Sequence, residues 1–295
     1  MSVTLERIGP LALEVSGPEG APLVVCLHGF PDVPATWRGL REALVGAGLR
    51  VATPWLRGYA PSSLEGPFDL DTAARDVVRV VDALSPGRPA ALVGHDWGAA
   101  CTVVAAARAP WAFSAAVTLA LPHPLAFVHN LASHPMQLRR SAYMALFQLP
   151  SWPERALVAR DGALVRRLWR AWSPGFEPPR EHLDEVVRCL RASLPGPLGW
   201  YRALPGQLLA PGPARVETPT LALHGARDGC VHPGLACGQS AWFAGPFEQE
   251  VVPAAGHFLH LEQPALVHAR VLAWLGEHPA PAGSAQRAAG TAAGG

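Results

Sequence analysis

Apolar residues along the chain form short continuous runs that alternate with longer segments of helical spacing. The runs predict buried strands over residues 23–27, 51–54, 90–93, 115–121, 220–223 and 249–253, after a leading hairpin over 3–8 and 11–16. Helical spacing predicts helices over 71–84 and 261–275. Continuous apolar strands that alternate with helices are typical of a mostly parallel sheet with both faces covered, so the predicted fold class is α/β.

The alternation stops after residue 121 and resumes at residue 218. Between residues 122 and 205 the chain is rich in Arg, Pro and Trp and shows helical spacing without strand spacing. Because open α/β sheets bind ligands at the carboxyl ends of their strands, a helical cap inserted here would roof a site. We expect a core domain over 1–121 and 206–278, an inserted helical cap over 122–205, and a disordered tail over 279–295.

Composition and charge restrict the partners and the location. The 295-residue chain is 49% hydrophobic and has a formal net charge of +1, with no basic cluster, so neither nucleic acid nor an anionic surface is an expected partner. No segment has the pattern of a membrane span or of an N-terminal signal. The five cysteines are scattered without a C-x-x-C pair, which favours reduced thiols and a cytoplasmic location.

Residues 94–98 read Gly-His-Asp-Trp-Gly and lie between a predicted strand and an Ala-rich stretch. Strand, tight turn and helix are the context of a nucleophile elbow, and the central residue here is Asp96 instead of Ser. A carboxylate attacks acyl groups poorly, but it can open an epoxide or displace a halide at a saturated carbon and form an ester. The alternative is that Asp96 only caps the following helix.

Two later strands are followed by residues that suit such a nucleophile. Asp228 follows the strand predicted over 220–223, and His257 follows the strand predicted over 249–253. The order nucleophile, acid, base is that of α/β-hydrolases, so we expect His257 to be the base and Asp228 to orient it. His260 competes for the role of base, but it lies further along, where we expect it to pack or to face solvent.

The loop after residue 27 reads His28-Gly29-Phe30-Pro31. Such a loop can aim a backbone N–H at the site, and the residue after the nucleophile supplies a second, so we expect an oxyanion hole from Phe30 and Trp97. His28 is a candidate substrate-binding residue, although a histidine in this place is more often a hydrogen-bonded core residue.

The predicted cap contains Tyr143 and Tyr201, two of the three tyrosines in the chain. A tyrosine hydroxyl can donate a proton to an opening epoxide oxygen, and two can hold that oxygen from opposite sides. The residue types alone favour the simpler interpretation, in which both tyrosines are packing residues of helices.

Taken together, these segments resemble the α/β-hydrolase-fold epoxide hydrolases, from about residue 5 to about residue 275. Segments 143–150 and 200–202 resemble the two cap-tyrosine segments of that family, so the resemblance implies that Tyr143 and Tyr201 are proton donors. Ala60 stands where the family usually has Gly, and we interpret Tyr59 as structural. The other segments that carry the resemblance are Gly94-His95-Asp96-Trp97-Gly98, His28-Gly29-Phe30-Pro31, Arg57-Gly58-Tyr59, Asp228 and Gly256-His257.

The resemblance implies a two-step hydrolysis of a small hydrophobic epoxide to a vicinal diol, with no metal and no organic cofactor. Asp96 forms a hydroxyalkyl ester, which water activated by His257 then hydrolyses. Phe147 and Trp152 are expected to line an apolar, aromatic pocket. Because the base must be neutral, activity is expected to fail in acid at about pH 6–7.

Two other functions stay open. A haloalkane dehalogenase has the same Asp nucleophile, but Phe30 stands where such enzymes often have an Asn donor, and Trp97 replaces the Arg of haloacid dehalogenases. A non-catalytic ligand-binding protein of the same fold is the second alternative. It would not need Asp96, the acid, the base and both tyrosines together.

Overall fold

The computed structural model describes residues 2–209 and 215–281, which contain one eight-stranded sheet in the order β1-β2-β4-β3-β5-β6-β7-β8. Neighbouring strands from β4 to β8 in this order are parallel. Strand β2 pairs antiparallel with both β1 and β4. This arrangement confirms the predicted α/β class. The strands are β1 (Val3–Ile8), β2 (Leu11–Ser16), β3 (Leu23–Leu27), β4 (Arg50–Pro54), β5 (Ala90–His95), β6 (Phe113–Leu119), β7 (Thr220–Gly225) and β8 (Phe247–Val252).

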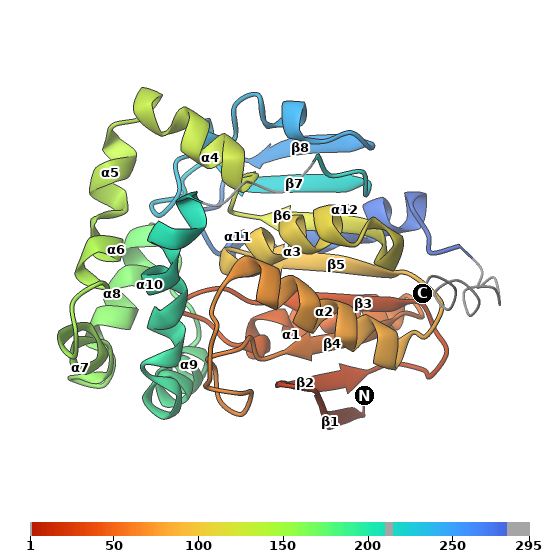
Figure 1. The fold of residues 1–295 in the computed structure, drawn as a ribbon, viewed down its shortest axis with the longest axis horizontal. Helices are drawn as coiled ribbons and strands as arrows, with labels where there is room; N and C mark the ends of the chain where they lie inside the picture. The colour runs from red at the N-terminus through yellow and green to blue at the C-terminus, as the bar shows by residue number, and fades with distance from the viewer. Residues whose placement is uncertain (1, 210–214, 282–295) are drawn as a thin grey trace, which may run out of the picture.

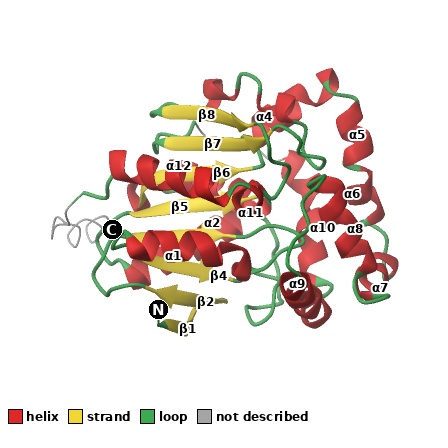
Figure 2. Cartoon of the chain, turned by 180° about the vertical axis from the view of Figure 1, so that it is seen from behind, coloured by secondary structure: helices red, strands yellow, loops and turns green. Residues whose placement is uncertain are grey.

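Helices cover both faces of the sheet (Figures 1 and 2). Helices α2 (Leu70–Leu84) and α3 (Trp97–Arg108) pack together on one face, and α1 (Arg38–Gly46) and α12 (Pro264–Glu277) pack together on the other. Alternate residues of a central strand enter different cores, because side chains of a strand point to opposite faces. Val25 belongs to one core and Val24 to the other, which explains why the strands read as continuous apolar runs.

The last predicted helix, over 261–275, is two helices in the structure. The short α11 (Leu259–Glu262) ends before Gln263, and α12 begins at Pro264. Proline has no N–H to donate and disfavours helical backbone in the residue before it, so the break falls at this position.

Between β6 and β7 the described residues form helices and no strand, and we call residues 122–209 the helical insertion. The insertion lies beyond one end of the sheet in both views (Figures 1 and 2). The boundary predicted at residue 205 falls inside a helix that continues to Leu209, although Pro205 lies within it. Its α-helices are α4 (Pro124–Asn130), α5 (Met136–Arg140), α6 (Ala142–Leu146), α7 (Trp152–Val158), α8 (Ala163–Trp172), α9 (Arg180–Ser193) and α10 (Gly196–Leu209).

Two indole N–H groups join the insertion to loops at the carboxyl ends of strands. Trp169 Nε1 donates to the carbonyl of Pro31, 3.0 Å away, in the loop after β3. Trp200 Nε1 donates to the carbonyl of Arg57, 2.9 Å away, in the loop after β4. The insertion therefore sits over the edge of the sheet where the predicted site residues lie.

Within the described ranges, no helix combines the length and the apolar character needed to cross a membrane. The tail predicted over 279–295 lies outside the described residues from position 282 onward.

Candidate active site

The turn between β5 and α3 holds Asp96 in an unusual backbone conformation. Its φ is 53° and its ψ is −120°, a region that costs a non-glycine residue about 1–3 kcal/mol. The turn is tight, because a Cβ on Gly98 would overlap the backbone of Leu27 and a Cβ on Gly94 would overlap that of Gly98. The Asp96 side chain makes no capping hydrogen bond to α3, so the interpretation of Asp96 as a mere helix cap is wrong.

The loop after β3 brings a backbone donor to Asp96. The N–H of Phe30 donates to Asp96 Oδ1 at 2.8 Å. Gly29 makes this approach possible, since a Cβ there would overlap the Asp96 side chain. Trp97 is the first residue of α3, where backbone N–H groups have no partner within the helix.

His28 is fully buried and uses both ring nitrogens on the backbone. The N–H of Leu56 donates to Nε2 at 3.1 Å, so the proton of the neutral ring sits on Nδ1, which donates to the carbonyl of Gly29 at 2.9 Å. Burial also lowers the pKa of His28, which keeps the ring neutral. The prediction of His28 as a substrate-binding residue is therefore wrong, because both of its polar atoms hold the loop.

Asp228 and His257 follow the neighbouring strands β7 and β8, and they meet Asp96, which follows β5, at the same end of the sheet. His257 Nδ1 lies 2.9 Å from Asp228 Oδ2, and His257 Nε2 lies 3.6 Å from Asp96 Oδ2. The other oxygen of Asp228 accepts the N–H groups of Cys230 at 2.7 Å and of Val231 at 2.9 Å. All three predicted side chains are buried together.

The charges of this group set the protonation of His257. Burial by itself lowers the pKa of His257, but the carboxylates of Asp228 and Asp96 more than offset burial and raise it to about 10. Burial by itself raises the pKa of Asp228. The charge of His257 and the hydrogen bonds from His224 and His257 outweigh burial, so the pKa of Asp228 is lowered overall. His257 is thus held as a cation in the resting site at neutral pH.

His260 is not the base. It is buried on α11, its Nε2 lies 2.6 Å from Thr36 Oγ1, and its ring stacks on Trp37. Of the two placements expected for it, the structure shows packing.

Tyr143 on α6 and Tyr201 on α10 lie side by side, with ring centroids 5.8 Å apart. The ring centroid of Tyr201 lies 5.2 Å from that of Phe30, 5.2 Å from that of Trp97 and 5.1 Å from that of Phe147. One aromatic cluster therefore joins the insertion to the elbow. Burial raises the pKa of both hydroxyls well above 10, which keeps both protonated at neutral pH. The buried hydroxyl of Tyr201 has no hydrogen-bond partner among the described residues.

Trp152 lies outside this aromatic cluster. It is the first residue of α7, half of its surface is exposed, and no ring contact joins it to the cluster in the described part of the chain. Two residues for which the sequence predicted no catalytic role lie close to the site instead. Trp172 contacts both His257 and Tyr143, with ring centroids 5.3 and 5.2 Å away, and Cys230 Sγ lies 3.7 Å from the Tyr143 hydroxyl.

Comparison with known proteins defines the family. Residues 22–264 match the family described as alpha/beta hydrolase fold. The chain is 30% identical over 274 residues to epoxide hydrolase 4 of Mus musculus. This match covers 89% of this chain and 75% of that protein. It is also 30% identical over 273 residues to the AB hydrolase superfamily protein YfhM of Bacillus subtilis (strain 168), and this match covers 90% of this chain and 94% of that protein.

A solved structure agrees with these relatives. The crystal structure of epoxide hydrolase A from Mycobacterium thermoresistibile matches with a TM-score of 0.75 and 26% identity, over 93% of this chain and 98% of that chain. The protein therefore belongs to the alpha/beta hydrolase fold family. Its resemblance to the epoxide hydrolases of that fold is confirmed as well.

Proposed function

We propose that the protein hydrolyses a small hydrophobic epoxide to a vicinal diol through an ester on Asp96. One observation carries the proposal: the buried Asp96 carboxylate lies between a backbone N–H on Oδ1 and the His257 ring near Oδ2. Relatives named epoxide hydrolases support the choice of substrate.

The two oxygens of Asp96 have different roles in the first step. The Phe30 N–H holds Oδ1, so Oδ2 is the oxygen free to attack. Oδ2 forms a bond to one epoxide carbon from the back side as the carbon–oxygen bond breaks, and Tyr143 or Tyr201 donates a proton to the leaving oxygen. The product is a hydroxyalkyl ester on a neutral Asp96.

The second step hydrolyses that ester. Once the ester has formed, Asp96 no longer carries the charge that favours protonated His257, and His257 passes its proton to the tyrosinate. The neutral His257 ring, oriented by Asp228, then removes a proton from water, and the resulting hydroxide attacks the ester carbonyl carbon. The N–H groups of Phe30 and Trp97 stabilise the oxyanion. The diol leaves and the carboxylate re-forms. The proton released by His257 has restored the tyrosine and the proton taken from water restores His257, so no external reagent besides water is consumed.

We also propose that the helical insertion is the cap of this site and that residues 2–121 and 215–278 form the core domain. Helix α10 carries Tyr201 into the aromatic cluster of the elbow, which supports this division. A cap in this place excludes water and supplies the proton donors that the core lacks.

Dehalogenation is the second candidate, because the same carboxylate can displace a halide. A halide leaving group needs N–H donors, and the phenyl ring of Phe30 offers none. Two tyrosines whose rings pack together can donate O–H groups to a leaving oxygen, so the aromatic cluster favours the epoxide.

A turnover panel tests the proposal. Purified protein is mixed with aryl and alkyl epoxides beside chloro- and bromoalkanes, and diol and halide are measured. We expect diol without halide. Halide without diol would assign dehalogenation, and ligand binding that survives Asp96→Ala with no turnover would assign a binding protein.

A further inference from the structure

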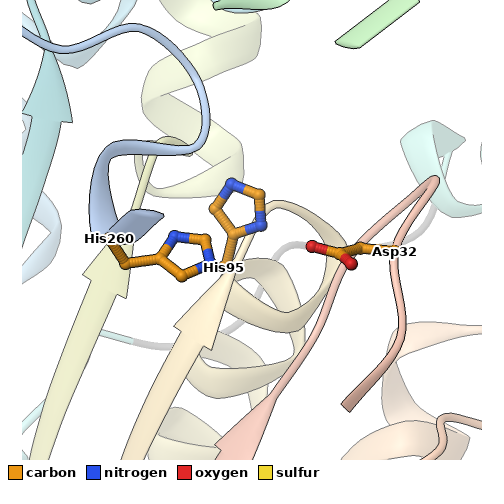
Figure 3. A group of neighbouring side chains, drawn as sticks. All are labelled: Asp32, His95 and His260. Atoms are coloured by element: carbon orange, nitrogen blue, oxygen red, sulfur yellow. The ribbon is translucent and has the colours of Figure 1, made fainter. Parts of the chain in front are cut away.

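Behind the elbow lies a second buried polar group, formed by Asp32, His95 and His260 (Figure 3). One nitrogen or oxygen from each side chain lies within 4.8 Å of the other two. The three residues come from the loop after β3, the end of β5 and α11. All three side chains are buried, so the fold gathers these polar groups away from bulk water.

Each of the three side chains has one satisfied polar atom and one that is unsatisfied. His95 Nε2 lies 3.0 Å from the carbonyl oxygen of His257, and His260 Nε2 lies 2.6 Å from Thr36 Oγ1. Asp32 Oδ2, His95 Nδ1 and His260 Nδ1 have no hydrogen-bond partner in the described residues. A buried polar atom without a partner costs about 1–3 kcal/mol, so three in one place indicate a bound species.

The donor and acceptor roles of the three atoms restrict that species. His95 Nε2 faces a carbonyl and carries the proton, so Nδ1 of the neutral ring is an acceptor. Burial lowers the pKa of His95 to about 4, which keeps the ring neutral. Asp32 Oδ2 is also an acceptor. When the Thr36 hydroxyl donates to Nε2 of His260, Nδ1 of that ring is a donor.

A water molecule satisfies two acceptors and one donor with three hydrogen bonds, the usual number for a buried water. Hydrogen bonds of about 2.8 Å place the partners of a water about 4.6 Å apart. One polar atom of each side chain lies within 4.8 Å of the other two, a range that a bridging water spans without movement of the side chains. A divalent metal would need a lone pair from each atom, and a protonated Nδ1 on His260 has none to offer.

We propose that Asp32, His95 and His260 bind one buried water molecule, and that this water site positions the backbone of His257. The second part rests on the proposed function, in which His257 is the base of ester hydrolysis.

The contacts of His95 connect the water site to the base. Its Nε2–H donates to the His257 carbonyl, and its ring lies 4.8 Å from that of His257 and 4.7 Å from that of His260. On the other side, the His257 N–H donates to the carbonyl of Trp172 at 3.1 Å. The backbone of the base is thus held from both sides. His95 also directly precedes Asp96, so one ring fixes the base relative to the nucleophile.

The first test is a high-resolution crystal structure of the wild-type protein with metal analysis of the same sample. We expect one water peak bonded to all three side chains and no stoichiometric metal. An anomalous peak with about one equivalent of a divalent metal would overturn the water assignment, and so would contact distances that exclude any bound species. This test does not depend on the activity of the protein.

The second test separates positioning from general stability. His260→Leu removes the donor, His260→Gln keeps one, and His268→Leu is a control at a partly buried histidine outside the group. We expect His260→Leu to slow ester hydrolysis on the order of tenfold while ester formation is unchanged, and His260→Gln to restore much of the loss. Wild-type ester hydrolysis in folded His260→Leu would refute positioning. Wild-type protein that forms no diol would instead refute the proposed function. If His260→Leu does not fold, the folded His260→Gln variant decides. We expect it to hydrolyse the ester at close to the wild-type rate, and a rate on the order of tenfold lower would contradict the rescue.

Discussion

At Asp96 the two oxygens of one carboxylate have different neighbours, and the chemistry follows from that difference. Oδ1 is bonded to the Phe30 N–H, and Oδ2 faces His257. The sequence predicted Asp96, Asp228 and His257 because each follows a strand, and parallel strands end at one edge. It did not predict the exposure of Trp152, and it left His28 open between a substrate contact and a hydrogen-bonded core residue, because both depend on the neighbours that the fold supplies.

The protonation of His257 gives a pH prediction that revises the expected fall at about pH 6–7. The charges of Asp228 and Asp96 raise the pKa of His257 in the resting protein, and esterification removes the charge of Asp96. The base must be neutral, so ester hydrolysis rises with pH through the lower pKa of the ester form. We expect single-turnover ester hydrolysis to titrate at a lower pH than His257 of the free protein followed by NMR. Identical titrations would contradict this coupling.

The two tyrosines give a prediction about the first step only. Tyr143→Phe combined with Tyr201→Phe should slow ester formation from an epoxide by about 10²–10⁴-fold, because the leaving oxygen loses its proton donors. The Tyr201→Phe change should alter the stability of the protein little, since the Tyr201 hydroxyl has no hydrogen-bond partner among the described residues. Rapid-quench kinetics with thermal melts measure both effects. An unchanged rate of ester formation would show that the tyrosines only pack.

At the scale of elements, the strand pattern predicted the sheet closely, and helices were harder. The strand predicted over 115–121 is observed at Phe113–Leu119, because burial on both faces gives a continuous apolar run with diffuse ends. The helices of the insertion were predicted as a region but not individually. The insertion has helical spacing, but its contacts to core loops, such as the one from Trp169 to Pro31, depend on the fold and do not mark where each helix begins or ends.

The elbow makes a stability prediction at Gly98. Gly98→Ala should destabilise the protein by about 1–3 kcal/mol or more, because the new Cβ would overlap the backbone of Leu27. Gly46→Ala on α1 is a matched control, since a Cβ there meets nothing within 4 Å. Urea unfolding of both variants measures the difference. Equal stability of the two variants would contradict the tight packing of the elbow.

The contact between α9 and the loop after β3 makes stability depend on pH. His182 Nε2 lies 2.9 Å from Asp32 Oδ1, and although burial lowers the pKa of His182, the charge of Asp32 raises it overall above 6.5. The stabilisation is therefore fully present below pH 6.5, the unfolded value, and is lost as pH rises through the folded pKa. Urea unfolding of His182→Gln and wild type should differ most below pH 6.5. A difference in unfolding free energy between the two proteins that grows as pH rises would contradict this account.

At the scale of the whole molecule, the proposed mechanism takes its nucleophile, acid and base from the core and its proton-donating tyrosines from the insertion. Asp96 and His257 lie at the carboxyl ends of strands, and Tyr201 of α10 packs on Trp97, the residue after Asp96. The sequence predicted this division from the loss of strand pattern after residue 121. It missed the end of the insertion, because α10 continues through Pro205 to Leu209.

The ester on Asp96 is the central claim, and His257→Gln tests it most directly. This variant is mixed with an aryl epoxide, and the intact protein and its peptides are weighed by mass spectrometry. We predict a mass increase equal to that of one epoxide, located at Asp96, while wild type releases diol and Asp96→Asn shows neither. Diol formed by His257→Gln at the wild-type rate, or an adduct at another residue, would contradict the account.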